Sequence, residues 1–156
     1  MRLVLALLFL MGLCSCNTQV PSAQQVAVEG AYVYNSGVLA NSGSPSSVVA
    51  KLSSADLTGC PEDFTKAFKA YVEAWESFSP IAKEMYAKNM KKATADLGAF
   101  IGGFAQNPTA AAVELKRQWP EYSAQIDKAN SSLLSAFSAM KSVGVKYNAV
   151  YNTTFW

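Results

Sequence analysis

The sequence predicts an all-α protein, an up-and-down bundle of three long helices and one or two short ones, behind an extended N-terminal tether. Three observations predict this fold. Apolar residues recur every three or four positions through most of the chain after residue 60, which is the spacing of one helix face. Proline stands near the start of each such segment, where it suits a first helical turn. Few residues join the segments, so consecutive helices are expected to lie side by side and antiparallel.

The chain begins with a short apolar segment. Arg2 supplies a positive charge, and residues 3–13 form an uninterrupted apolar run. This run is too short to span a bilayer as a mature helix, and its pattern is typical of an export signal. We therefore expect residues 1–15 to be a signal peptide.

The residues after this run resemble the lipobox of bacterial lipoproteins. In Leu13-Cys14-Ser15-Cys16, a leucine stands three positions before the last cysteine and a small serine directly before it. Cys16 fits the lipid-bearing position better than Cys14, which follows the large Leu13. The resemblance implies export, cleavage before Cys16 and attachment to a membrane through acyl chains on Cys16. With Asn17 next, it implies a location at the outer membrane of the bacterial cell envelope, facing the periplasm.

Residues 16–45 are expected to be a lipid-anchored polar tether, and residues 46–156 the helical bundle domain. The tether is rich in Ser, Asn, Gln and Gly and has few charges. Within it, four apolar side chains recur at even-numbered positions: Val26, Val28, Tyr32 and Tyr34. This spacing predicts a strand or an extended strap over residues 25–34. A strap docked on the domain fits better, because a lone strand is not stable.

The first helices of the domain are placed by their start signals. Ser44-Pro45 resembles a helix start, so a short helix is expected from Pro45 to Leu52. A long helix follows Cys60-Pro61, where acidic residues suit the positive end of the helix dipole. Its apolar face is formed by Phe64, Ala67, Phe68, Tyr71, Trp75 and Phe78.

The remaining helices follow in the same way. Ser79-Pro80 begins a helix expected to run to about Ala105, with Glu84–Lys88 and Lys92–Asp96 spaced as solvent-side pairs. Asn107-Pro108 opens a short helix, and Trp119-Pro120 begins a last long helix that ends near Val145. Three glycines in the second long helix predict close approach of a neighbouring helix: Gly98, Gly102 and Gly103. Residues 146–156 carry no clear pattern.

Composition restricts the function. The net charge of +2 includes Arg2 of the signal, so the mature chain is nearly neutral and lacks the basic stripe of a nucleic-acid-binding surface. The chain has no histidine. This excludes a serine–histidine or cysteine–histidine hydrolase and Glu-x-x-His di-iron helices, and it disfavours zinc. No metal or cofactor is expected.

Cys60 is the candidate reactive residue. With Cys14 removed and Cys16 lipidated it is the only thiol left, so no intramolecular disulfide is expected. A helix N-terminus favours a thiolate, whereas the neighbouring Glu62 and Asp63 oppose it. The alternative interpretation of Cys60 is a small buried side chain that caps the bundle.

Cys60-Pro61-x-Asp63-Phe64-x-x-Ala67 followed by Ala74-Trp75 resembles a motif of small exported helical proteins of uncharacterised function. In that group a histidine is expected where this chain has Tyr71. The resemblance implies a shared fold element and no particular activity.

Aromatic residues are the candidates for ligand contacts. Tyr71, Trp75 and Trp119 would line a groove if one exists, although aromatic residues at helical spacing are more often core. The predicted function is a lipid-anchored envelope module for binding or interaction, without a catalytic site. Its partners are the membrane, through Cys16, and an envelope protein or a small apolar ligand. The alternatives are a thiol-dependent redox protein or enzyme centred on Cys60 and a carrier of a small apolar ligand.

Overall fold

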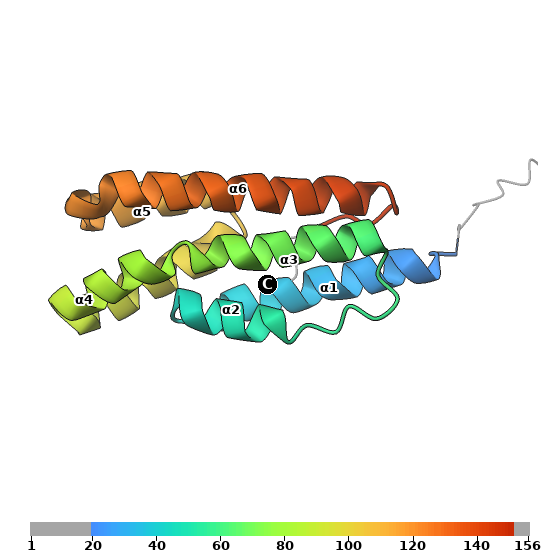
Figure 1. The fold of residues 1–156 in the computed structure, drawn as a ribbon, viewed down its shortest axis with the longest axis horizontal. Helices are drawn as coiled ribbons and strands as arrows, with labels where there is room; N and C mark the ends of the chain where they lie inside the picture. The colour runs from blue at the N-terminus through green and yellow to red at the C-terminus, as the bar shows by residue number, and fades with distance from the viewer. Residues whose placement is uncertain (1–19, 152–156) are drawn as a thin grey trace, which may run out of the picture.

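The computed structural model describes residues 20–151 and is all-α over them, which confirms the predicted fold class (Figure 1). The signal peptide and lipidation site expected at residues 1–15 and Cys16 lie outside the described residues. None of the described helices is long and apolar enough to cross a membrane. The elements are α1 (Ala23–Ala40), α2 (Pro45–Ser53), α3 (Glu62–Glu76), α4 (Ser79–Phe104), α5 (Pro108–Gln118), a 3-10 turn η1 (Pro120–Tyr122) and α6 (Ser123–Val145).

Helix α1 occupies the segment that the sequence assigned to the tether. The extended strap predicted over residues 25–34 is wrong: these residues are helical, and Ser22 caps the helix by accepting a hydrogen bond from the Gln25 backbone N–H at 3.0 Å. The alternating pattern arose because α1 carries apolar side chains on two faces. Its inner face is buried, with Val28, Ala31, Tyr32, Val38 and Leu39, whereas Val26 and Val33 are exposed. The helical domain therefore begins near residue 23 rather than 46.

Helices α2 and α3 start close to their predicted positions. Ser44 caps α2 by accepting a hydrogen bond from the Ser47 N–H at 3.2 Å, and Pro45 occupies the first turn. Gly59, with φ +83°, turns the chain before Pro61, and a left-handed conformation of this kind favours glycine. Four side chains of the predicted stripe are buried on α3, Phe64, Phe68, Tyr71 and Trp75, and Val72, which was not predicted, is buried with them.

Helix α4 bends at Asn89, which the sequence did not predict. Asn89 has φ −157° and ψ 93°, outside the helical region. Its Oδ1 accepts a hydrogen bond from the Lys92 backbone N–H at 3.0 Å, so Asn89 caps the second half of the helix. The single long helix predicted from Pro80 to Ala105 is therefore two helical halves joined at a kink.

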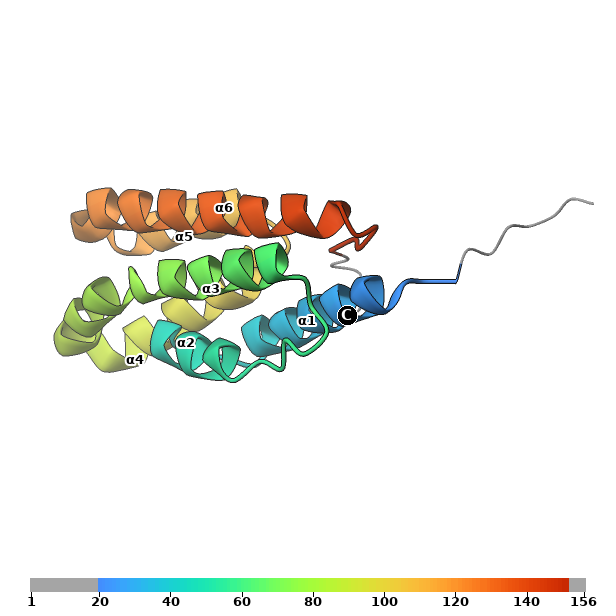
Figure 2. The same ribbon diagram turned by 45° about the vertical axis from the view of Figure 1, so that its right-hand side comes forward.

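The helices pack as a bundle in which α3 and α6 lie side by side and run in opposite directions (Figures 1 and 2). Helix α5 lies against α4 and α6, and α2 lies against α3. Helix α1 contacts α2 and α4, and its Tyr32 hydroxyl donates a hydrogen bond to the Met140 carbonyl of α6 at 3.2 Å. Hydrogen bonds from Tyr147 Oη and Lys146 Nζ to the Asp63 carboxylate, at 2.8 and 3.3 Å, join the end of α6 to the start of α3.

The chain after α6 also belongs to the core. Asn148 takes a left-handed conformation, φ 58°, which asparagine tolerates better than most residues. Beyond it, Tyr151 places its ring 5.0 Å from those of Tyr32 and Phe137, measured between centroids. Its hydroxyl accepts hydrogen bonds from Asn35 Nδ2 at 2.8 Å and Ser36 Oγ at 3.0 Å. The segment from residue 146, left without a predicted structure, thus closes the bundle over α1.

Candidate binding site

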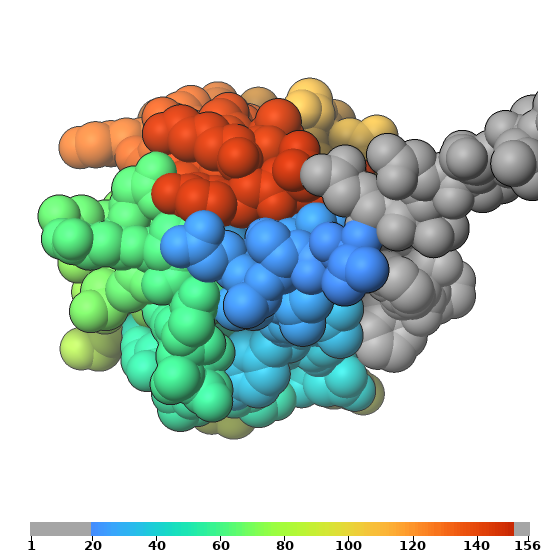
Figure 3. Space-filling view, turned by 90° about the vertical axis from the view of Figure 1, so that its right-hand side faces the viewer, coloured from blue at the N-terminus to red at the C-terminus, as the bar shows by residue number. Residues whose placement is uncertain are grey.

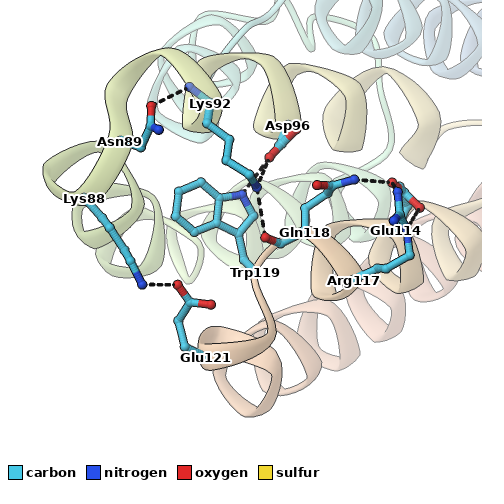
Figure 4. A network of polar contacts seen from close by, with 9 residues as sticks. All are labelled: Lys88, Asn89, Lys92, Asp96, Glu114, Arg117, Gln118, Trp119 and Glu121. Carbon is cyan, nitrogen blue, oxygen red and sulfur yellow. Dashed lines mark hydrogen bonds and ion pairs between the residues drawn. The ribbon is translucent and has the colours of Figure 1, made fainter.

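A polar cluster joins α4 to the end of α5 (Figure 4). Asp96 Oδ2 accepts two hydrogen bonds, from the Trp119 indole Nε1–H at 2.8 Å and from Lys92 Nζ at 2.7 Å. Lys92 Nζ also donates to the Gln118 carbonyl at 2.9 Å and lies 4.1 Å from the centre of a Trp119 ring. The Asp96 side chain is only 20% exposed, so this ion pair is better shielded from water than an ordinary surface pair.

Local sequence explains the cluster. The Asn89 cap starts the second half of α4, and Lys92 and Asp96 then follow one turn apart on the same face. Trp119 lies between α5 and η1, where Pro120 prevents the helix from continuing. An ion pair between Lys88 and Glu121 adds a second link between α4 and η1 (Figure 4). Helix α4 and the segment from Trp119 to Glu121 are therefore held together at two points.

Next to this cluster, a hollow of about 240 Å³ opens between α4 and α5. The buried side chains of Phe100 and Leu115 form its apolar floor, and Ala99, Gly103, Ala110 and Ala111 are apolar lining residues nearer the surface. Its polar lining residues, here called the rim, are Asp96, Gln106, Asn107, Glu114 and Gln118. A Cβ added at Gly103 would lie 3.4 Å from the Ala111 Cβ. Close helix approach, predicted from the glycines, is thus confirmed at Gly103, whereas Gly102 faces open space.

The rim of the hollow carries two oriented carboxylates. Glu114 accepts hydrogen bonds from Arg117 Nε at 2.8 Å, Arg117 Nη2 at 2.6 Å and Gln118 Nε2 at 2.9 Å. The bonds from Arg117, followed by that from Gln118, lower the pKa of Glu114 to about 2, so it is ionised at neutral pH. An apolar floor beside fixed acceptors suits a small molecule with an apolar body and a hydrogen-bond-donating or cationic group.

A second hollow, of about 600 Å³, lies between α2 and α3. Leu52, Phe68 and Val72 contribute apolar surface to it, and Lys69, Glu73 and Glu76 are among its polar residues. This hollow is wider but more open to solvent than the one between α4 and α5. It offers a ligand less enclosure.

All three candidate ligand residues are buried in the core. Tyr71 and Trp75 are fully buried and line neither hollow, so of the two interpretations of these residues the structure supports the core and not the ligand groove. The Tyr71 hydroxyl lies near the Trp75 indole N–H and the Asn35 amide, but outside hydrogen-bond geometry. Burial raises the pKa of Tyr71. Trp119 is also buried, but it bonds to Asp96 on the rim of the α4–α5 hollow.

Cys60 lies in the turn that precedes α3 and is partly exposed. Burial, and then the charge of Asp56, raise the pKa of its thiol above the ordinary value, so neither favours a thiolate. Cys60 lines neither of the two hollows described above. Within residues 20–151, no three His, Cys, Asp or Glu side chains gather as a metal ion would require.

Sequence reasoning missed the polar cluster although one signal was present. Lys92 and Asp96 were expected to form a solvent-side pair, and they do form an ion pair, but it is shared with Trp119. The pair expected between Glu84 and Lys88 is replaced by one between Lys88 and Glu121. No protein-family model, curated protein or solved structure matches this chain.

Proposed function

We propose that this chain is a lipid-anchored protein of the bacterial cell envelope that works as a binding or interaction module. The anchor is supported by the lipobox-like sequence Leu13-Cys14-Ser15-Cys16 after an apolar run. Asn17 supports an outer-membrane location facing the periplasm. The folded domain begins at α1, only a few residues after Cys16.

The anchor is tested by labelled-palmitate incorporation in a bacterial host. Cys16→Ala is expected to abolish labelling, because the thiol that would carry the lipid is gone. Cys14→Ala is the matched control and is expected to retain labelling, since Cys14 lies on the signal side of the proposed cleavage site. Unchanged labelling of Cys16→Ala would refute the anchor.

The observation that carries the binding role is the hollow between α4 and α5. Its apolar floor and the hydrogen-bonded carboxylates of Asp96 and Glu114 suit a small amphiphile with a hydrogen-bond-donating or cationic group. Its volume of about 240 Å³ limits the ligand to a small one. An envelope protein remains the alternative partner.

Primary alkylamines of increasing chain length serve as probes of this hollow, with the matching alcohols as uncharged counterparts. The amines are expected to raise Tm, because a ligand that binds only the folded state stabilises it. Ala110→Phe should fill the hollow and remove the shift, whereas Ala124→Phe, at an exposed position outside it, should retain the shift. Glu114→Gln should weaken the effect of the amines more than that of the alcohols.

Equal shifts in Ala110→Phe and in the unchanged protein would show that the probes bind elsewhere. An absence of any shift would contradict the small-ligand role and favour an envelope protein as the partner. Either result would leave the anchor unaffected, because the anchor is measured separately.

The thiol-dependent alternative has less support, because the surroundings of Cys60 raise the pKa of its thiol. Slow alkylation of the folded protein at neutral pH, accelerated by unfolding, is expected if Cys60 has a packing role. Rapid alkylation of the folded protein with a low apparent pKa would favour a redox role instead.

A further inference from the structure

The outer face of α1 is apolar and is largely free of contact with the rest of residues 20–151. Val26, Gly30, Val33 and Gly37 follow one another at helical spacing along this face, and Val26 and Val33 are each 57% exposed. No atom of the bundle lies within 4 Å of a Cβ added at Gly30 or Gly37. In Figure 3, α1 (blue) lies at the surface below the end of α6 (red).

Exposed apolar side chains are concentrated at α1. Of the eight large ones within residues 20–151, α1 carries Val26, Val33 and Tyr34, and Val20 lies just before the helix. Scattered exposed apolar residues are normal on a protein surface, but a row of them along one helix marks an interaction surface. The helix has one charged residue, Glu29, whose carboxylate accepts a hydrogen bond from Gln25.

The position of α1 in the chain indicates what covers this face. Seven peptide steps separate Cys16 from Ala23, the first residue of α1. Even fully extended, these steps span at most about 25 Å, since each residue adds no more than about 3.6 Å. A lipid on Cys16 would therefore keep α1 next to the bilayer. A flexible tether over residues 16–45 would have allowed the domain to lie farther away.

We propose that the outer face of α1, defined by Val26, Gly30, Val33 and Gly37, lies on the surface of the bilayer that holds the lipid of Cys16. The inference rests on the proposed lipid anchor and goes beyond it, because an anchor alone does not orient the domain. The contact is apolar rather than electrostatic, since α1 carries no basic residue. The anchor supplies the membrane attachment, and the α1 face sets the orientation.

The test uses the lipidated full chain in neutral phosphatidylcholine vesicles, with Cys60→Ser removing the native thiol. An environment-sensitive fluorophore is attached to Val33→Cys or, as the matched control, to Val113→Cys in α5. These two valines are equally exposed, at 57% and 56%, and both lie within helices. Quenching by phospholipids that carry a nitroxide spin label then reports contact with the bilayer. The intact mass shows independently whether acyl chains are present.

A blue-shifted and quenched probe at position 33, with neither effect at position 113, is the expected result. Added anionic phosphatidylglycerol should leave it unchanged, because no basic residue of α1 takes part. Acylated protein with equal quenching at both positions would overturn the orientation and leave the anchor intact. Quenching that requires the anionic lipid would also overturn the orientation. So would a blue shift without quenching together with a disulfide between two unlabelled Val33→Cys chains, because these results would place a second copy of the chain on this face. Protein without acyl chains would refute the anchor and the orientation together.

Discussion

Trp75→Ala tests the core at its largest fully buried side chain. The indole is 0% exposed, and its nearest aromatic neighbours are Phe104, with ring centroids 5.2 Å apart, and Phe100, 6.0 Å apart. Truncation to alanine removes roughly 150 Å² of buried apolar surface, about 4 kcal/mol at 25 cal/mol per Å². It also removes a buried N–H that finds no hydrogen-bond acceptor among the described residues, which recovers about 1 kcal/mol.

The expected net loss is therefore about 3 kcal/mol of the free energy of unfolding, against a total of about 5–15 kcal/mol for a domain of this size. Urea denaturation followed by circular dichroism measures it. With an m-value of about 2 kcal/mol/M, the midpoint should fall by about 1.5 M.

Glu73→Ala is the control on the same helix. Glu73 is exposed and forms no ion pair with a described residue, so its loss should cost under about 0.5 kcal/mol. Equal midpoint shifts for the two variants would refute the assignment of the buried face of α3, and with it the contacts of Trp75 with Phe100 and Phe104 of α4.

Three further predictions concern single contacts. Asp96→Ala should lower the free energy of unfolding by about 1–3 kcal/mol, measured in urea, because the buried indole N–H of Trp119 loses its acceptor; a loss below that range would mean that water replaces the carboxylate. Burial raises the pKa of Tyr32 from 10.0 to about 12, so the unfolded chain ionises first and stability should fall between about pH 10 and 12. Tyr32→Phe should flatten that part of the midpoint–pH profile, and a profile of unchanged slope would contradict the assignment. Gly144→Ala would place a Cβ on the Tyr32 hydroxyl, 2.8 Å from the Tyr32 Cζ, and should lower the free energy of unfolding by about 1–3 kcal/mol. Gly102→Ala, in open space, should raise it by about 0.4–1 kcal/mol. Comparable Tm changes of one sign in the two variants would show that the contact between residue 144 and Tyr32 is absent.

The sequence predicted the elements whose caps and periodicity agree. Ser44-Pro45, Ser79-Pro80 and Asn107-Pro108 each mark a real helix start, because a first-turn proline acts locally. Ser44 and Asn107 also cap their helices by accepting a backbone N–H, whereas α4 begins without a side-chain cap. The stripe from Phe64 to Trp75 is buried as predicted, because α3 is polar on its other face and its period is therefore visible.

Helix α1 was missed for the opposite reason. With Val28 and Tyr32 on its inner face and Val26 and Val33 on its outer face, its apolar residues show no single 3.6-residue period. The bend in α4 was missed because Asn89 is an ordinary surface residue until its Oδ1 accepts the Lys92 N–H.

The candidate site was only partly predictable. The hollow between α4 and α5 is formed by the packing of two helices. Its lining residues form no catalytic or metal-binding motif that could be recognised in the sequence. Tyr71 and Trp75 were candidate ligand residues because they are aromatic, but both rings are buried in the core.

The contact between Tyr151 and α1 affects when the domain can become native. Tyr151 Oη accepts a hydrogen bond from Asn35, 116 residues earlier in the chain. At about 5–20 residues per second, the ribosome needs roughly 6–23 s to make this stretch. During that time the inner face of α1 can already pack against earlier segments such as Phe64 of α3, but it lacks Met140 and Tyr151, which complete its cover. Final closure of the fold over α1 therefore waits until Tyr151 has been made, so a shorter nascent chain cannot reach the native packing of this helix.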